Sequence, residues 1–460
     1  MREIETMTSQ PASTTKTATP APRPPNIVRV GIVGYGTVGR ATAEILSSHA
    51  DEIRRRTDGI SIIVTRIARK SPRASETGSN GVTVAADWRE VVQAPDVDIV
   101  VEAIGGTGIA YDVVRDALEN GKAVVTANKA LLAKAGSELF TLAREKKLPI
   151  GIEASVAGGV PVIRAISEAL AADRIKSVYG IVNGTCNYIL TQMEQRGLDF
   201  AAALEQAQAA GYAEAEASLD IDGWDARDKI AILARIAFGV NINAVEIPVT
   251  GIRHITATDL HYAHRLKSTI RLVASAERSN GGIHIAVEPW LEPIDSMLAK
   301  VDGANNALFI AGEKVGTQMF YGRGAGGDAT GTAVLSDVLE IAKQIARGHT
   351  SASTLAGFLS EEPVHLCMRK QPMSWFLRLS VNDRPGILAR TAEAIAREGI
   401  NIDSVIQEPH MPKDRLSFVI TLEPTTEETA RRAVAAINHF EFMREPVLLL
   451  PMISSVEEHV

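Results

Sequence analysis

The sequence predicts an α/β protein with an N-terminal doubly wound parallel sheet, an α+β middle domain and a small C-terminal domain. Three observations predict this fold class. An apolar strand at 27–33 runs into a glycine-rich turn and a helix, strands and helices then alternate to about residue 150, and six short elements in βαββαβ order begin near residue 373. Alternation favours a parallel sheet, and the last order is typical of a split-βαβ sandwich.

Composition excludes several classes of function. A chain of 460 residues allows two or three domains, and its net charge of -7 comes with no basic stripe for nucleic acid. Cys186 and Cys367 are the only cysteines, which argues against a disulfide framework and fits a reducing compartment. No apolar run approaches the roughly 20 residues of a membrane span. We therefore expect a cytoplasmic protein with no nucleic-acid or membrane partner.

The glycine-rich turn is GYGTVG, residues 34–39. The first glycine permits the turn, the second lets backbone approach a pyrophosphate, and the third allows close helix packing. The helix N-terminus that follows favours phosphate. A plain glycine turn is the alternative, but the strand–turn–helix context predicts dinucleotide binding. We expect the contacts to come from Val33, Gly34, Gly36, Thr37, Val38 and Gly39.

The second strand, expected at 60–65, ends in TRIARK. A cofactor with a free ribose 2′-hydroxyl usually meets an acidic residue here, and none is present. Arg66, Arg69 and Lys70 instead lie where a 2′-phosphate would bind. This predicts NADPH over NADH, although basic residues after a strand are also common by chance.

Polar residues follow two more expected strands, in VDIVVEAIGG (97–106) and KAVVTANK (122–129). Ligands of doubly wound sheets lie beyond the carboxyl ends of the strands. Thr107, Asn128 and Lys129 should therefore face the nicotinamide half of the cofactor, with Lys129 opening a helix over 129–147. Gly105 is a further expected cofactor contact. A surface lysine is the alternative for Lys129.

The stretch GYAEAEASLDIDGWDARDK, residues 211–229, is the predicted centre of the chemistry. Asp225 and Lys229 are spaced i, i+4, so a helix beginning near residue 222 presents both on one face. The acidic residues before this helix fall in a loop. Together they could hold a substrate ammonium and protonate a carbonyl oxygen. The alternative is a solvated acidic loop with an ordinary surface pair.

Two further loops are open to two interpretations each. EASVAGGVP, residues 153–161, offers carbonyl oxygens and a carboxylate for a hard cation, or is a flexible connection. YGRGAGGDAT, residues 321–330, either returns the chain to the first domain with glycine N–H groups near the ligand or only permits a sharp bend.

These blocks together resemble the homoserine dehydrogenase family over nearly all of residues 27–455. The resemblance is carried in register by GYGTVG, VEAIGG, TANK, EASVAGGVP, NGTCNYIL, the 214–229 stretch and YGRGAGGDAT. The C-terminal unit is similar to ACT domains. The resemblance implies reversible reduction of L-aspartate 4-semialdehyde to L-homoserine, on the way to threonine and methionine.

The resemblance also implies residue roles. Lys229 matches the family's general acid, Asp225 its partner in holding substrate, and Lys129 a residue between nicotinamide and substrate. Glu214 and Asp220 match carboxylates that grip the amino-acid end of the substrate. The sequence departs from the usual Thr-Glu-Pro at Ala213-Glu214-Ala215, which frees the loop at Glu214. Gly211 and Gly327 match cofactor contacts, and Glu153, Val156, Gly158 and Val160 match a sodium or potassium loop.

An ACT-like unit implies feedback regulation. We expect threonine to bind at a turn formed by Asp383 to Gly386 and Asn401, within a homo-oligomer, dimer or tetramer. An oligomerisation module without ligand is the alternative. The expected divisions are a disordered tail (1–26), a dinucleotide-binding domain (27–152 plus 322–348), a substrate-binding and dimerisation domain (153–321), a linker (349–372) and the ACT domain (373–455).

Two rival functions remain at this point. An aspartate-semialdehyde dehydrogenase would use a thiolate nucleophile, and Cys186 in NGTCN resembles a nucleophile turn. No phosphate-binding arginine pattern accompanies it. A non-catalytic NADP sensor with an amino-acid-binding tail is the other rival.

Overall fold

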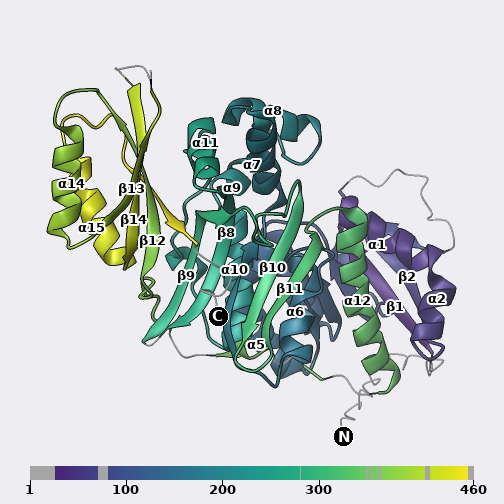
Figure 1. The fold of residues 1–460 in the computed structure, drawn as a ribbon. Helices are drawn as coiled ribbons and strands as arrows, with labels where there is room; N and C mark the ends of the chain where they lie inside the picture. Colours follow the sequence, from purple (N-terminus) through teal and green to yellow (C-terminus); the bar gives the residue numbers. More distant parts are fainter. Residues whose placement is uncertain are drawn as a thin grey trace, which may run out of the picture.

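The computed structural model describes residues 26–70, 81–279, 281–348, 351–352, 355–360, 364–409 and 415–453. The predicted tail lies outside these residues except for Asn26, as do parts of the predicted linker. The described chain forms two sheets with helices around them (Figure 1).

The first sheet is parallel and has the strand order β3-β2-β1-β4-β5-β6. Its central strands are apolar on both faces, because helices cover both. The helices α1, α2 and α12 contact one face, and α4 and α5 contact the other. The doubly wound prediction is therefore confirmed. The elements are β1 (Ile27–Val33), α1 (Thr37–Ser48), α2 (Ala50–Arg56), β2 (Ser61–Ala68), β3 (Thr83–Ala85), α3 (Arg89–Val92), β4 (Ile99–Glu102), α4 (Ile109–Glu119), β5 (Ala123–Thr126), α5 (Lys129–Lys146), β6 (Ile150–Gly151) and α12 (Gly327–Ala346).

Helix α12 comes late in the chain but packs beside α1 in the first domain (Figure 1). Glycines make this approach close: a Cβ at Gly331 would lie 3.1 Å from the backbone nitrogen of Thr42, and one at Gly327 would lie 3.2 Å from Cγ2 of Thr37. The glycine-rich segment before α12 thus returns the chain to the first domain. The N-termini of α1 and α12 meet beside the GYGTVG turn.

The second sheet has nine strands in the order β11-β10-β7-β8-β9-β15-β12-β14-β13. Its first five strands belong to the middle domain and pack on α7, α10 and α11. Its last four form the C-terminal unit. The middle-domain elements are α6 (Val162–Arg164), β7 (Ile175–Ile181), α7 (Gly184–Arg196), α8 (Phe200–Ala209), α9 (Ser218–Ile221), α10 (Trp224–Phe238), α11 (Ala257–Arg265), β8 (Ser268–Ser279), β9 (Gly282–Pro293), β10 (Asn305–Gly312) and β11 (Gly316–Arg323).

The C-terminal unit has the predicted βαββαβ order, with α14 and α15 on one face of its strands (Figure 1). Its other face lies against the middle domain, where Arg378 binds the fully buried Asp259 of α11 at 2.9 Å. The elements are α13 (Ala356–Leu359) in the connection, then β12 (Met373–Val381), α14 (Ile387–Arg397), β13 (Ile402–Gln407), β14 (Leu416–Thr425), α15 (Glu427–Asn438) and β15 (Leu448–Met452).

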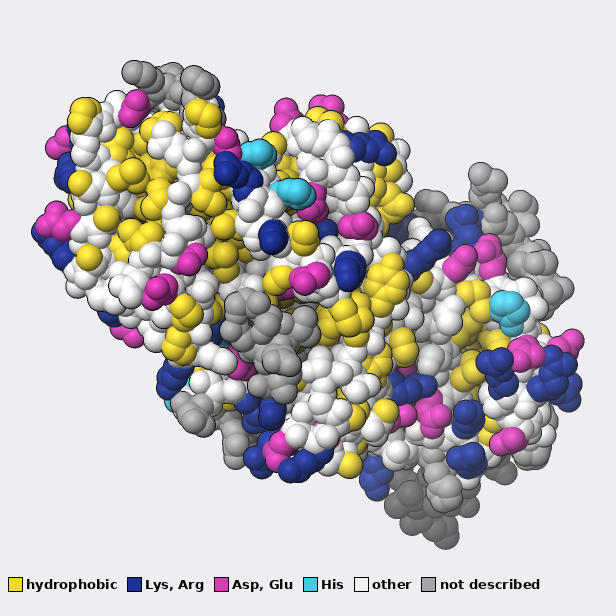
Figure 2. All heavy atoms as spheres, viewed as in Figure 1, with side chains coloured by type: hydrophobic (Ala, Val, Ile, Leu, Met, Phe, Trp, Pro, Cys, Tyr) yellow, Lys and Arg dark blue, Asp and Glu magenta, His cyan; other side chains and the backbone are white. Residues whose placement is uncertain are grey.

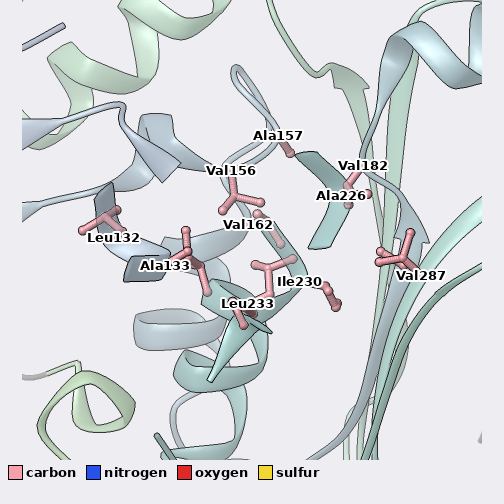
Figure 3. Packing of buried hydrophobic residues seen from close by; sticks show 14 of the residues in the cluster. Leu132, Ala133, Val156, Ala157, Val162, Val182, Ala226, Ile230, Leu233 and Val287 are labelled. Atoms are coloured by element: carbon pink, nitrogen blue, oxygen red, sulfur yellow. The ribbon is translucent and has the colours of Figure 1, made fainter. Parts of the chain in front are cut away.

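The core between the two domains holds α5 against α10. Figure 3 shows Ala133 of α5 beside Leu233 of α10, and Leu132 and Ile230 belong to the same buried cluster. The buried guanidinium of Arg235 adds hydrogen bonds from α10 to the backbone carbonyls of Leu132 and Ala133, at 3.0 and 3.3 Å. This packing fixes the start of α5 relative to α10. Among the helices of the described chain, none is long and apolar enough to cross a membrane.

Candidate active site

The glycine turn after β1 is shaped by close backbone approaches. Gly34 has φ +99°, and a Cβ there would lie 2.5 Å from the carbonyl oxygen of Ala103. A Cβ at Gly39 would lie 2.0 Å from the carbonyl oxygen of Gly34, so α1 and the turn touch directly. Gly36 caps α1, and a Cβ there would meet no atom within 4 Å. The open space at the N-terminus of α1 is suited to a pyrophosphate.

A second loop after β4 lies next to this turn and is held by a buried carboxylate. Glu102 accepts hydrogen bonds from the backbone N–H groups of Ile104 (2.8 Å) and Gly105 (3.3 Å). The amide of Asn128 donates to the carbonyl of Gly106 at 2.7 Å. The sequence motifs drew attention to the glycines, but the role of Glu102 was not predicted. Thr107 follows on the same loop, before α4.

The structure differs from the sequence prediction at Arg66. The second strand continues to Ala68, so Arg66 lies within β2 and its Nε binds Asp96 at 2.7 Å. Asp96 precedes β4, and the amino ends of parallel strands lie at the edge opposite the glycine turn. Arg66 therefore points away from the expected ligand. Lys70 is exposed just beyond β2, and Gly34 donates its N–H to Ala68 there at 2.9 Å.

One buried carboxylate joins the two predicted lysines. Asp225, in the first turn of α10, binds Nζ of Lys229 at 2.8 Å and Nζ of Lys129 at 3.0 Å. Lys229 lies one turn further along α10, as its i, i+4 spacing predicts. Lys129 is the first residue of α5, which follows β5 at the ligand edge of the first sheet. Asp225 thus ties the middle domain to that edge.

The end of β7 supplies partners that sequence reasoning missed. Nζ of Lys229 donates to the carbonyl of Val182 at 2.7 Å. The amide of Asn183 donates to Asp225 at 2.8 Å and to Asp220 at 2.7 Å. Asn183 also caps α7, because its side-chain oxygen accepts from the N–H of Cys186. An Asn before a helix indicates a cap, but its link to carboxylates about forty residues away needs the fold.

The two later loops also reach this cluster. Asn306 of β10 donates to the carbonyl of Val182 at 3.1 Å. A Cβ at Gly324 would lie 2.1 Å from that Asn306 amide, and one at Gly158 would lie 2.6 Å from the Gly324 carbonyl oxygen. The 153–161 and 321–330 segments therefore pack on each other beside the lysine–aspartate cluster.

The charged groups of the cluster shift the pKa values of their neighbours. Burial acts to raise the pKa of Asp225, but the two ammonium groups outweigh burial and hold the pKa well below its usual value. The charge of Asp225 in turn raises the pKa of Lys129. For Asp220, burial and the neighbouring Asp225 raise the pKa. A cationic partner at Asp220 would relieve this repulsion.

Glu214 and Gly211 lie apart from the cluster contacts. Both are exposed in the segment between α8 and α9, where the buried Ala213 and Ala217 anchor the chain. The Glu214 carboxylate makes no hydrogen bond to any described residue, while its backbone carbonyl accepts from Gln208 at 3.2 Å. Thr185 holds the same segment through the carbonyl of Tyr212 at 2.7 Å.

Cys186 is fully buried, and its Sγ donates to the carbonyl of Asp220 at 3.1 Å. Burial, together with the nearby carboxylates, raises its pKa well above the usual value. A thiolate nucleophile is therefore disfavoured at this position, which argues against the semialdehyde dehydrogenase alternative.

The carboxylate of Glu153 is already used within the protein. It accepts backbone N–H groups of Ile163 (3.1 Å) and Arg164 (2.8 Å) at the start of α6. Ala157 and Gly158 have φ values of 55° and 50°, so the loop curls tightly. Among the described residues, no group of three or more acidic, His or Cys side chains could hold a metal ion.

The predicted effector residues do not form one turn within the chain. Val381, at the end of β12, pairs with Leu416 of β14, whereas Ile402, at the start of β13, pairs with Leu422. Six residues of strand separate these positions by roughly 20 Å. The turn at Asp383 to Gly386 and Asn401 therefore lie at opposite ends of the sheet.

Comparison with known proteins agrees with this geometry. Family models described as "Homoserine dehydrogenase, NAD binding domain", "Homoserine dehydrogenase" and "ACT domain" match residues 34–153, 161–339 and 375–439. A homoserine dehydrogenase of Pseudomonas aeruginosa is 39% identical over 92% of this chain and 98% of its own length. The chain belongs to the homoserine dehydrogenase family.

Solved homoserine dehydrogenases share the fold. The one from Thiobacillus denitrificans has a TM-score of 0.85 at 36% identity, covering 93% of this chain and 98% of that chain. A hyperthermophilic archaeal homoserine dehydrogenase in complex with NADPH has a TM-score of 0.59 at 28% identity, covering 71% of this chain and all of that chain. This chain is thus an oxidoreductase of the homoserine dehydrogenase family with a nicotinamide cofactor, an amino-acid substrate and an ACT domain.

Proposed function

We propose that the protein reversibly reduces L-aspartate 4-semialdehyde to L-homoserine with NADPH, in the supply of threonine and methionine. The observation that carries this proposal is the buried Asp225 held between the ammonium groups of Lys229 and Lys129, beside the ligand edge of the first sheet. An aldehyde bound there would have cationic N–H donors on one side and the cofactor cleft on the other.

Lys229 has the geometry of a proton donor. Its ammonium carries three N–H groups, of which two point to Val182 and Asp225. The third can point to the aldehyde oxygen, stabilise the developing alkoxide and deliver a proton to it. Asp225, whose pKa the two lysines hold well below its usual value, also fixes the position of the Lys229 ammonium at 2.8 Å. The nicotinamide, when bound, supplies the hydride.

The amino-acid end of the substrate would lie toward Asp220 and Glu214. Asp220 already belongs to the cluster through Asn183, and a substrate ammonium would offset its repulsion with Asp225. Glu214 is exposed on a segment without the usual proline, so we propose that it reaches the substrate when this segment closes over it. Gly211 would contact the cofactor from the same segment.

For Lys229→Ala, we expect turnover of homoserine with NADP to fall by about two to four orders of magnitude, the usual contribution of general acid–base catalysis. The assay follows NADPH absorbance. Lys134→Ala is the matched control, because Lys134 is an exposed lysine on α5. Near-normal turnover in a folded Lys229→Ala protein would contradict the assignment of Lys229 as the proton donor.

The NADPH preference rests on Lys70 and Arg69 rather than on Arg66. Both follow the end of β2, where the Ala68 carbonyl receives the N–H of Gly34. We expect Lys70→Ala to lower kcat/KM for NADPH by about tenfold or more, the scale of a hydrogen bond to a charged group. The same variant should change kcat/KM for NADH little. Arg66→Gln is the control and should leave the preference unchanged. A wild-type enzyme that favours NADH would overturn this proposal.

We further propose that the 153–161 loop holds sodium or potassium through backbone carbonyls of Glu153, Val156, Gly158 and Val160. Support comes from the tight curl at Ala157 and Gly158 and from its packing against Gly324 beside the active site. Turnover should then be higher in sodium or potassium chloride than in choline chloride at equal ionic strength. Equal turnover in all three salts would contradict a bound cation.

We propose that threonine regulates the enzyme at a site shared by two subunits. The strand β13 is the outer edge of the nine-stranded sheet, and an unpaired edge is suited to pairing with a second copy. Figure 2 shows hydrophobic side chains gathered over the C-terminal unit, and exposed Val405 and Leu388 belong to β13 and α14. A two-fold axis at β13 would place the Asp383 turn of one subunit near Asn401 of the partner subunit.

A continuous set of contacts supports coupling from this unit to the active site. Arg378 of β12 binds Asp259 and the carbonyl of His254, at the loop before α11. In that loop Arg253 binds Asp222 and Ser218, and Ile252 donates its N–H to Ile221 at 2.8 Å. These partners flank Asp220 in and after α9. A shift of β12 would therefore be transmitted through this short loop to Asp220, the carboxylate that we propose binds the substrate.

Asp383→Ala and Asn401→Ala should each raise the threonine concentration for half inhibition by roughly 5- to 150-fold, the usual range of allosteric coupling. Arg397→Ala, on the exposed side of α14, is the control. Mixing the two variants should restore one intact site per dimer and thus part of the sensitivity. Absence of restoration would exclude a shared site, and insensitivity of the wild type to threonine would exclude the effector.

A further inference from the structure

A hollow lies where the C-terminal unit joins the middle domain, on the face of the second sheet that carries Tyr179 and Trp290. Its volume is about 100 Å³. Met373 and Ile453, at the two points where the chain enters and leaves the C-terminal unit, both line it. The polar and aromatic lining comes from Ser177, Tyr179, Ser275, Glu277, Trp290 and Arg369.

Arg369 is the cation of the hollow, and its side chain is 8% exposed. The guanidinium lies over the Trp290 ring, 5.1 Å from the centroid, and 3.7 Å from the Glu288 carboxylate. Its Nη1 meets the Met373 sulfur at 3.1 Å, and its Nη2 meets the Ser275 hydroxyl at 3.5 Å. The sulfur and hydroxyl contacts are weak, and the Glu288 carboxylate at 3.7 Å does not form the two parallel bonds that an arginine prefers.

Glu277 is the anion of the hollow. It lies two residues after Ser275 on β8, so both side chains are on one face of the sheet, and it pairs in register with Ser177 of β7. Its carboxylate makes no hydrogen bond or ion pair with any described residue, including Arg369. Burial raises the pKa of Glu277, and the charge of Arg369 lowers it in part. A separate cation and anion thus share one cavity.

We propose that this hollow binds a small zwitterion of the α-amino-acid class, with its carboxylate on Arg369 and its ammonium on Glu277. Its side chain would lie against Tyr179 and Trp290, whose rings form the apolar wall. The cavity volume suits a small amino acid rather than a nucleotide or a peptide. This site lies apart from both the lysine–aspartate cluster and the Asp383 turn.

The position of the hollow gives its ligand an influence on the C-terminal unit. The backbone N–H of Arg369 donates to Glu427, the first residue of α15, at 3.1 Å. A ligand that moved Arg369 would therefore act on α15, Met373 and Ile453 together. The effect of the ligand on the C-terminal unit rests on the proposed regulation. Binding of the ligand to the hollow does not, because binding is measured without turnover.

The experiment is calorimetric titration of the full-length protein with L-threonine, L-methionine, L-isoleucine and inorganic phosphate. The starting protein is Asp383→Ala/Asn401→Ala, which removes the proposed shared site. We expect one of the three amino acids to bind, with affinity reduced tenfold or more by Glu277→Gln and by Arg369→Gln. The control is Lys314→Gln, which removes an exposed charge (83% side-chain exposure) in the turn after β10, outside the residues that line the hollow.

Thermal melting checks that each variant is folded, and Glu277→Gln keeps the shape of the side chain if Arg369→Gln does not fold. Three results would overturn the proposal: no amino acid binds, phosphate alone binds, or Glu277→Gln binds like its parent. Adding Lys229→Ala should lower turnover by the amount expected above and leave this binding intact, so failure of the reaction and failure of the site are separable.

Discussion

A single buried carboxylate organises this molecule. Asp225 has almost no contact with solvent, and such a charge is stable in the interior only when it is paired and hydrogen-bonded. Lys229, Lys129 and the Asn183 amide together meet this requirement. Because these partners come from α10, α5 and the end of β7, the carboxylate also fixes three elements from two domains. The stability of the site and its chemistry therefore depend on the same charge.

The surrounding fold brings the ends of distant elements to that point. Strands of the first sheet end there with glycine turns, which leave room for a cofactor, while Lys129 begins α5 beside them. The return segment before α12 reaches Asn306, and Asn306 shares the Val182 carbonyl with Lys229. Since this carbonyl accepts from both, a change in the return segment would be felt directly at the ammonium.

The sequence predicted the features that depend on residues close together along the chain. The i, i+4 spacing placed Asp225 and Lys229 together, and strand–turn–helix order placed Gly34, Gly36 and Gly39. Arg66 was misplaced because β2 runs three residues further than expected, which turns a loop residue into a strand residue with its own partner, Asp96. Asn183 and Glu102 were missed because their partners are set by tertiary contacts. Asn401 was grouped with the Asp383 turn by the resemblance to ACT domains, and the pairing of β12 and β13 with opposite ends of β14 is set by the tertiary fold.

The pairing between β15 and β9 has a consequence for the evolution and engineering of the chain. Strand β9 is twelve residues long, and β15 meets it in register at Met452 and Leu291. Two segments outside the C-terminal unit pair with the rest of this edge, Val249 with Val287 and Leu366 with Ile283. A shortened protein ending before residue 373 would keep these two pairings and expose the β9 edge only around Leu291, where an added charge would discourage pairing with another chain.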